Sequence, residues 1–116
     1  MTTRLNDMAY EHAQNLIKEG RYILDQRDDW SERNPSASTE NTFIEKHGWS
    51  EYQKWYLATD GQEDEHTKVR YKFPYGDFEQ VHCCGLISAE SRAGQYNHYD
   101  VEKAAPHMLS VLNELM

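Results

Sequence analysis

Apolar residues recur at three- and four-residue spacing along most of the chain, which is the pattern of helices with one buried face. The first such stretch covers residues 5–24, with Gly20 as a weak point because glycine costs about 1 kcal/mol inside a helix. A short helix follows over residues 38–47, and another begins with a capping-box pattern at Ser50. We expect the chain to bend between these two helices at Gly48 and Trp49, and the alternative is one kinked helix that runs through.

The pattern changes at residues 68–73, where Lys and Arg alternate with Val, Tyr and Phe. A period of two predicts an extended segment with one basic and one apolar face. Pro74 and Gly76 then interrupt it. Asp77 fits a helix N-cap, with Gln80 completing a capping box, so we expect a fourth helix with Phe78 as its first buried residue. Gly94 is the expected residue just past its end.

A fifth helix is expected to start at Asp100, a second good N-cap. Pro106 complicates it, because a proline in a helix interior loses one backbone hydrogen bond and costs about 3 kcal/mol. Either the helix kinks at Pro106, or a fresh helix starts near Ala105 with the proline in its first turn.

These elements predict a mostly α-helical protein, with residues 1–116 forming a single domain of about five helices. At most a short β-hairpin is expected near residues 68–75. The alternative is an α+β domain in which residues 81–87 form a strand.

Composition narrows the class of partner. The 116 residues carry a formal net charge of −8, which disfavours double-stranded nucleic acid and an anionic membrane as partners. There is no run of about eighteen apolar residues, so no membrane span is expected. The N-terminal segment lacks the apolar core of a secretory signal, and we expect a cytoplasmic protein whose two cysteines are thiols.

The alternating segment is the first candidate binding site. Its cations and rings, with Arg92 added, would suit a nucleotide, a single-stranded nucleic acid or an acidic peptide. The alternative is that the rings enter the core while the cations face water. The candidate binding residues are Lys68, Arg70, Tyr71, Lys72, Phe73, Tyr75 and Arg92.

The second candidate is the run His82, Cys83, Cys84, whose side chains are of zinc-ligand type. Three consecutive residues on a helix point apart, so they cannot share one metal without an irregular backbone, and we expect no metal and no cofactor. A catalytic thiolate is also not expected, because Cys83 would lie about two turns into the fourth helix, beyond the effect of its dipole. We also expect that the two thiols are not needed for folding.

Three segments resemble a family of small uncharacterised bacterial proteins. They are FIEKHGWSEYQKWYL at 43–57, KVRYKFPYGDFEQVHCCGLISAESRAGQ at 68–95 and HYDVEKAA at 98–105. The family has a similar tryptophan-rich helix, a YKFPYGDF-like turn and an alanine-rich helix ending in a Ser-Arg-Ala run. The resemblance covers roughly residues 40–105 and implies no established activity and no catalytic residues.

Two functions remain open from the sequence. The first is a non-enzymatic binding or interaction module, with an acidic peptide, a nucleotide or another protein as partner. The alternative is a small enzyme or ligand-binding protein with a site around Asp77, His82 and Arg92. An enzyme predicts a pocket with a titratable group of perturbed pKa, whereas a module predicts an exposed patch.

Overall fold

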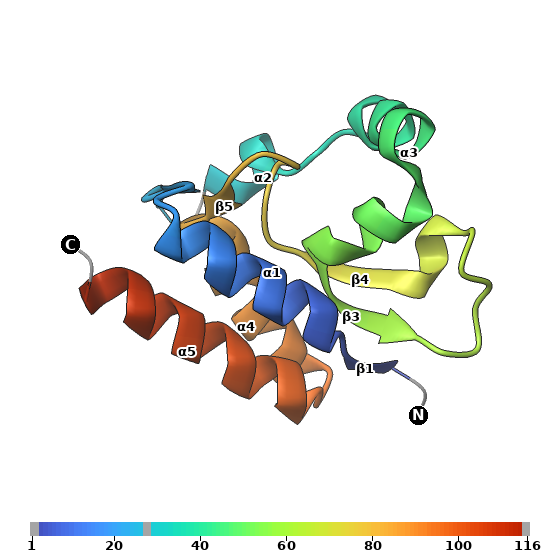
Figure 1. The fold of residues 1–116 in the computed structure, drawn as a ribbon. Helices are drawn as coiled ribbons and strands as arrows, with labels where there is room; N and C mark the ends of the chain where they lie inside the picture. The colour runs from blue at the N-terminus through green and yellow to red at the C-terminus, as the bar shows by residue number, and fades with distance from the viewer. Residues whose placement is uncertain (1–2, 27–28, 115–116) are drawn as a thin grey trace.

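A computed structural model describes residues 3–26 and 29–114 of the chain (Figure 1). The helices and strands run in the order β1 (Thr3–Leu5), α1 (Asp7–Lys18), β2 (Tyr22–Ile23), α2 (Trp30–Arg33), α3 (Ala37–Tyr52), β3 (Tyr56–Asp60), β4 (Tyr71–Pro74), β5 (Val81–His82), α4 (Cys83–Gln95) and α5 (Tyr99–Glu114). Short 3-10 turns also occur at Gln53–Trp55 and Lys68–Arg70.

The fold is an α+β mix, so the prediction of a mostly α protein with about five helices is wrong. In the described residues, four helices have twelve or more residues, α2 is a single turn, and five strands form two sheets. The larger sheet is antiparallel in the order β1-β3-β4, and the smaller one pairs β2 with β5 in parallel. Figure 1 shows α1, α4 and α5 on one side of the molecule and the larger sheet on the other. None of the described helices is long and apolar enough to cross a membrane.

Strand β3 explains the main error in the fold prediction. Its first three residues, Tyr56, Leu57 and Ala58, are all buried, because β3 is the central strand and is covered on both faces. Such a strand shows no apolar–polar alternation and reads like part of a buried helix. The helix expected after Ser50 therefore ends at Tyr52, and the chain becomes a strand four residues later.

The predictions made from two glycines agree better with the structure than the prediction for β3 does. α3 is broken at Gly48, whose φ of 82° and ψ of 170° confirm the expected bend. α1 ends before Gly20, which has φ 79°, and Arg21 N–H donates to the Leu16 carbonyl at 2.8 Å, as in a Schellman motif. The first helix is thus shorter than predicted, and Tyr22–Ile23 becomes strand β2.

Asp77 does not cap a helix, and this prediction is also wrong. Its Oδ1 accepts the N–H groups of Glu79 at 3.0 Å and Gln80 at 2.8 Å, but the turn is closed by Phe78 in the left-handed region at φ 71°. An Asp side chain in a tight turn accepts the same nearby N–H groups as an N-cap, so the two share a sequence pattern. The α+β alternative expected a strand over residues 81–87, and only Val81–His82 is extended before α4 begins.

The end of α4 also differs from the prediction. Gly94 lies inside the helix, and Asn97 at φ 62° ends it. His98 N–H donates to the Ala93 carbonyl at 2.8 Å, which is again a Schellman bond. α5 begins at Tyr99, so Pro106 lies within it and does not start a fresh helix.

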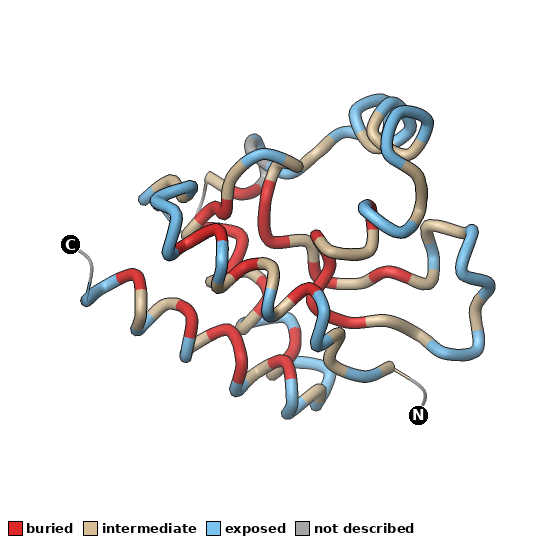
Figure 2. Tube along the Cα trace, in the orientation of Figure 1, coloured by how far each residue is buried: buried red, intermediate tan, exposed pale blue. Residues whose placement is uncertain are grey.

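The core lies where the helices meet the larger sheet (Figure 2). Tyr52, Trp55 and Tyr56 are all buried in it. The first half of α3, in contrast, projects from the body, and Tyr52 at its far end is the one buried residue of this helix. A Cβ at Gly85 would lie 2.7 Å from the carbonyl oxygen of Tyr75, so α4 packs directly on this backbone.

Gly85→Ala should therefore destabilise the protein by about 1–3 kcal/mol, even though alanine favours a helix, because the new methyl group has no space. Gly94→Ala is the matched control in the same helix, where the added Cβ meets only the flexible Glu102 side chain at 3.3 Å. It should be neutral or stabilising by up to about 1 kcal/mol. Urea unfolding of both variants measures the difference, and equal midpoints would contradict the close packing of α4 on Tyr75.

Candidate functional site

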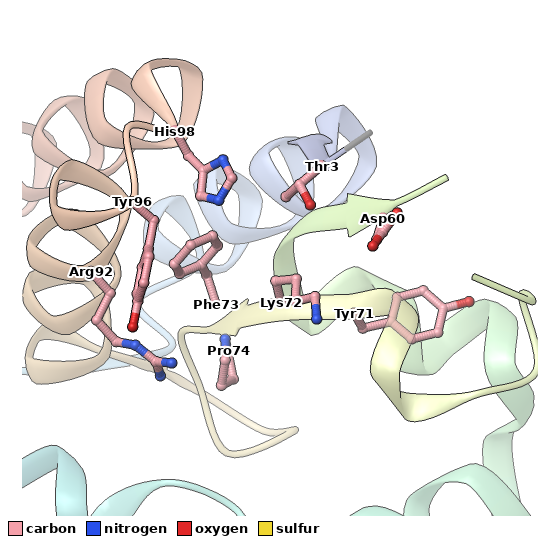
Figure 3. Close-up of a pocket in the computed structure, with 9 residues that line it drawn as sticks. All are labelled: Thr3, Asp60, Tyr71, Lys72, Phe73, Pro74, Arg92, Tyr96 and His98. Carbon is pink, nitrogen blue, oxygen red and sulfur yellow. The ribbon is translucent and has the colours of Figure 1, made fainter. Parts of the chain in front are cut away.

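A cleft of about 440 Å³ opens between strand β4 and the C-terminal end of α4 (Figure 3). Residues from all three strands of the larger sheet, from the last turn of α4 and from the turn after it surround it. They are Thr3, Asp60, Tyr71, Lys72, Phe73, Pro74, Arg92, Tyr96 and His98.

The backbone explains how these side chains reach one cleft. Lys72 stands between the buried Tyr71 and Phe73 on β4, as the period of two predicted. The Schellman turn after α4 turns the chain back, which brings His98 edge-on to the Phe73 ring at a centroid distance of 5.7 Å. Phe73 has φ 62°, a costly conformation for a residue with a Cβ.

The cleft is locally basic in an acidic chain. Lys72 and Arg92 come from segments twenty residues apart, and Figure 3 shows both at the cleft. Within the described part of the chain, neither has a carboxylate partner within 4.0 Å. Asp60 supplies a negative charge elsewhere along the cleft. Tyr96 is 56% exposed, and its side chain lies beside that of Arg92, so part of it is open to a ligand.

The structure divides the predicted basic–aromatic strip. Tyr71, Lys72 and Arg92 meet at the cleft, whereas Arg70 donates to the Glu63 carbonyl at 2.8 Å and Tyr75 is fully buried. The Tyr75 hydroxyl donates to the Lys54 carbonyl at 2.6 Å, so that ring belongs to the core, as the alternative interpretation expected.

Lys68 pairs with Glu40 at 3.4 Å, outside the cleft. Sequence reasoning missed Tyr96 and His98, because no periodic signal marks the turn after α4. The only local signal was the helix end: Gly94 was expected just past it, whereas α4 ends at Gln95 and Asn97 takes that place.

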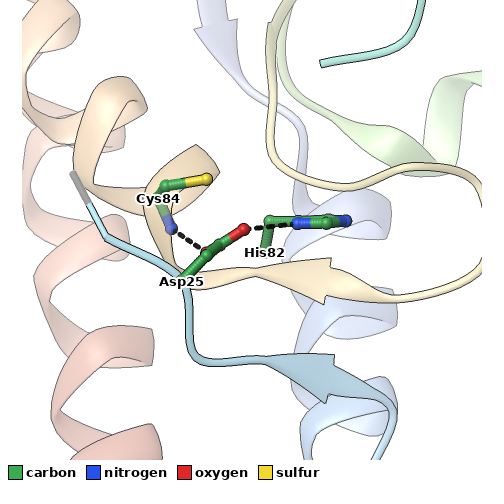
Figure 4. Close-up of side chains that lie close together, drawn as sticks. All are labelled: Asp25, His82 and Cys84. Carbon is green, nitrogen blue, oxygen red and sulfur yellow. Dashed lines mark hydrogen bonds and ion pairs between the residues drawn. The ribbon is translucent and has the colours of Figure 1, made fainter. Parts of the chain in front are cut away.

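A second group of polar residues is buried at the opposite end of α4 (Figure 4). His82 Nδ1 lies 2.6 Å from Asp25 Oδ2, and His82 Nε2 lies 2.8 Å from Asp77 Oδ2. Asp25 Oδ1 also accepts the backbone N–H of Cys84 at 2.7 Å. The parallel pairing of Ile23 with His82 brings Asp25, two residues after β2, to this point.

The charged residues of this group shift one another's pKa values. Burial lowers the pKa of His82, but its hydrogen bonds to Asp77 and Asp25 and their charges more than offset this, so the pKa lies above its ordinary 6.5. Burial raises the pKa of both carboxyl groups, but hydrogen bonds more than offset this and bring each pKa below its ordinary 3.8. Asp25 accepts hydrogen bonds from Cys84 and His82. Asp77 accepts them from His82, Gln80 and Glu79. The imidazolium form is therefore favoured between two carboxylates.

This arrangement bears on the enzyme alternative. Asp77 and His82 do come together, but Arg92 lies in the last turn of α4 while His82 precedes its first. The His82 side chain is 2% exposed, so it cannot reach a substrate in this conformation. Asp77 borders a second hollow of about 350 Å³ against α3, where Phe43 stacks on Phe78 at 4.4 Å.

The cysteines differ from their predicted positions. Cys83 and Cys84 are the first two residues of α4 and do not lie two turns into a helix. Burial and the nearby Asp25 carboxylate raise the pKa of the Cys84 thiol far above its ordinary 9.0, so it is not an activated nucleophile. Ligand atoms of Asp25, His82 and Cys84 all lie within 4.8 Å of one another, which makes this a possible place for a metal ion.

Comparisons with known proteins give no match to a family model, to a curated protein or to a solved structure. The resemblance over residues 40–105 stays a prediction, and the function follows from the geometry of the residues themselves.

The His82 group should give stability a pH dependence of known sign. A His with a raised pKa stabilises the fold fully below 6.5, and this stabilisation is lost as the pH rises through the folded-state pKa, at up to about 1.4 kcal/mol per pH unit. The lowered pKa values of Asp25 and Asp77 act in the acidic range: they stabilise the fold above pH 3.8, and this stabilisation is lost as the pH falls through the folded-state pKa values. Burial lowers the pKa of His12, so His12 changes the free energy of unfolding mainly as the pH drops below 6.5.

Urea melts between pH 6.5 and 8, in buffer with EDTA, therefore isolate His82. We expect the free energy of unfolding to fall with pH in wild type and to be flat in His82→Gln. If that variant does not fold, Asp77→Asn serves instead and should weaken the slope. A wild-type stability that does not change over this range would contradict a charged His82.

Proposed function

We propose that the chain is a binding module that holds a small anionic ligand with a planar group in the cleft between β4 and α4. The observation that carries this proposal is that Lys72 and Arg92, without carboxylate partners in the described residues, line one cavity of about 440 Å³. Two free cations converging on one hollow are typical of a site for phosphate or carboxylate oxygens.

The aromatic rings favour a nucleotide as the ligand class. Phosphate oxygens would accept hydrogen bonds from Lys72 and Arg92, while the base would cover the exposed Tyr96 ring. The volume of about 440 Å³ falls within the range of small-molecule sites. The overall charge of −8 opposes long polyanions, so a mononucleotide or a short single-stranded segment suits the protein better than a duplex.

Titration of the protein with nucleoside monophosphates at low salt, measured by calorimetry, tests this proposal. Lys72→Ala and Arg92→Ala should each weaken binding at least tenfold, because a hydrogen bond to a charged group contributes about 1.5–3 kcal/mol. Lys18→Ala removes an exposed charge at the end of α1 and is the matched control, for which affinity should not change. Binding should weaken as salt is raised.

Two comparison ligands show which part of the nucleotide matters. A nucleoside without phosphate should bind much more weakly, and inorganic phosphate should bind without needing Tyr96. An acidic peptide that binds while nucleotides do not would reject the nucleotide and retain the anion site. Equal affinity of wild type and both cleft variants for nucleoside monophosphates would reject the cleft as the binding site.

A further inference from the structure

We propose that Asp25, His82 and Cys84 form a zinc site at the N-terminal end of α4. This site is separate from the cleft, and neither proposal depends on the other. One carboxylate oxygen, one imidazole nitrogen and one sulfur are ligands that Zn²⁺ uses in proteins. Here they come from three places: the segment after β2, the end of β5 and the first turn of α4.

The distances fit a tetrahedral ion after a small movement. With ordinary zinc–ligand bond lengths, tetrahedral ligand atoms lie roughly 3.4–3.6 Å apart. The three ligand atoms here lie within 4.8 Å of one another, so the sulfur would move closer by up to roughly 1.2 Å to reach this spacing. Asp25 Oδ2 and His82 Nδ1 are 2.6 Å apart, a hydrogen-bond distance, and would separate by roughly 0.8 Å as the metal replaces the proton between them.

The surrounding hydrogen bonds are those that orient metal ligands. A ligating histidine usually donates its other ring N–H to a carboxylate, and His82 Nε2 has Asp77 Oδ2 at 2.8 Å. A ligating carboxylate is usually held by a further donor, and Asp25 Oδ1 accepts the Cys84 N–H at 2.7 Å. Asp77 would thus be a positioning residue, which fixes the imidazole with Nδ1 toward the metal.

The backbone removes the objection raised by the sequence. His82, Cys83 and Cys84 cannot all bind one metal on a regular helix, but the chain changes from strand to helix between the first two of them. This change lets His82 and Cys84 converge while Cys83 stays outside the group. Asp25 takes the third place, and no sequence spacing indicates it because it lies 57 residues before His82.

Charge and protons balance in the proposed step. Zn²⁺ replaces the Nδ1 proton of the imidazolium and the thiol proton of Cys84, so two protons leave to solvent for each metal bound. The ion, the Asp25 carboxylate and the Cys84 thiolate together carry no net charge, which suits a buried place. A water molecule fills the fourth position, as in zinc sites with three protein ligands.

The experiment uses the 116-residue chain, stripped with chelator and titrated with Co²⁺ and then Zn²⁺. One equivalent of Co²⁺ should give tetrahedral d–d bands and a thiolate-to-cobalt charge-transfer band, and one equivalent of Zn²⁺ should displace it. Cys84→Ser should lose the charge-transfer band, and Asp25→Asn should weaken zinc binding more than tenfold. Cys83→Ser is the matched control, and it should bind as wild type does because Cys83 is outside the group.

Circular dichroism of each variant without metal shows whether it is folded, and Cys84→Ala replaces any serine variant that is not. Release of two protons per zinc, measured by calorimetry in buffers of different ionisation enthalpy, is a second readout that requires both His82 and Cys84 to be ligands. No stoichiometric metal uptake by folded wild type would overturn the proposal. Equal loss of the cobalt band in Cys83→Ser and Cys84→Ser would also overturn it.

Discussion

The structure depends on one buried histidine held between two carboxylates. A charged imidazole that is 2% exposed is costly unless both ring nitrogens are bonded, and Asp25 and Asp77 provide both bonds. Each carboxylate also holds a second segment: Asp25 the first turn of α4, and Asp77 the turn that precedes β5. The two-residue β2–β5 sheet, the tight turn and the start of α4 are thus parts of one bonded group. Loss of any one partner leaves a buried charge behind.

Helix α4 connects this group to the cleft. Its first residues contribute Cys84 to the buried group, and its last turn contributes Arg92 to the cleft, so the two proposed sites lie at opposite ends of one element. The helix is fixed along its length, because Gly85 packs on the Tyr75 backbone and the neighbouring α5 lies against it. A rigid support of this kind keeps cleft side chains in place before a ligand arrives, which lowers the entropy lost on binding.

The sequence predicted what local pattern determines and missed what distant pairing determines. The bend at Gly48 and the weak point at Gly20 are local properties, and the structure has both. Central strand β3 was missed because its residues are buried on both faces. Asp77 was correctly seen as an acceptor of backbone N–H groups, yet a turn and a helix cap use it alike. In the cleft, Lys72 and Arg92 were candidates, but their meeting depends on how α4 packs beside β4.

The parallel pairing of β2 with β5 also has a consequence for how the chain folds. It joins Ile23 to His82 across more than half of the chain, through only two paired residues on each strand. Closing so long a loop has an entropic cost that so small a contact cannot offset alone. We therefore expect this pairing to form late, after α1, α4 and the larger sheet have come together. Until then Asp25, His82 and Cys84 are separate, solvated side chains, and a nascent chain cannot complete this group before residue 84 is made.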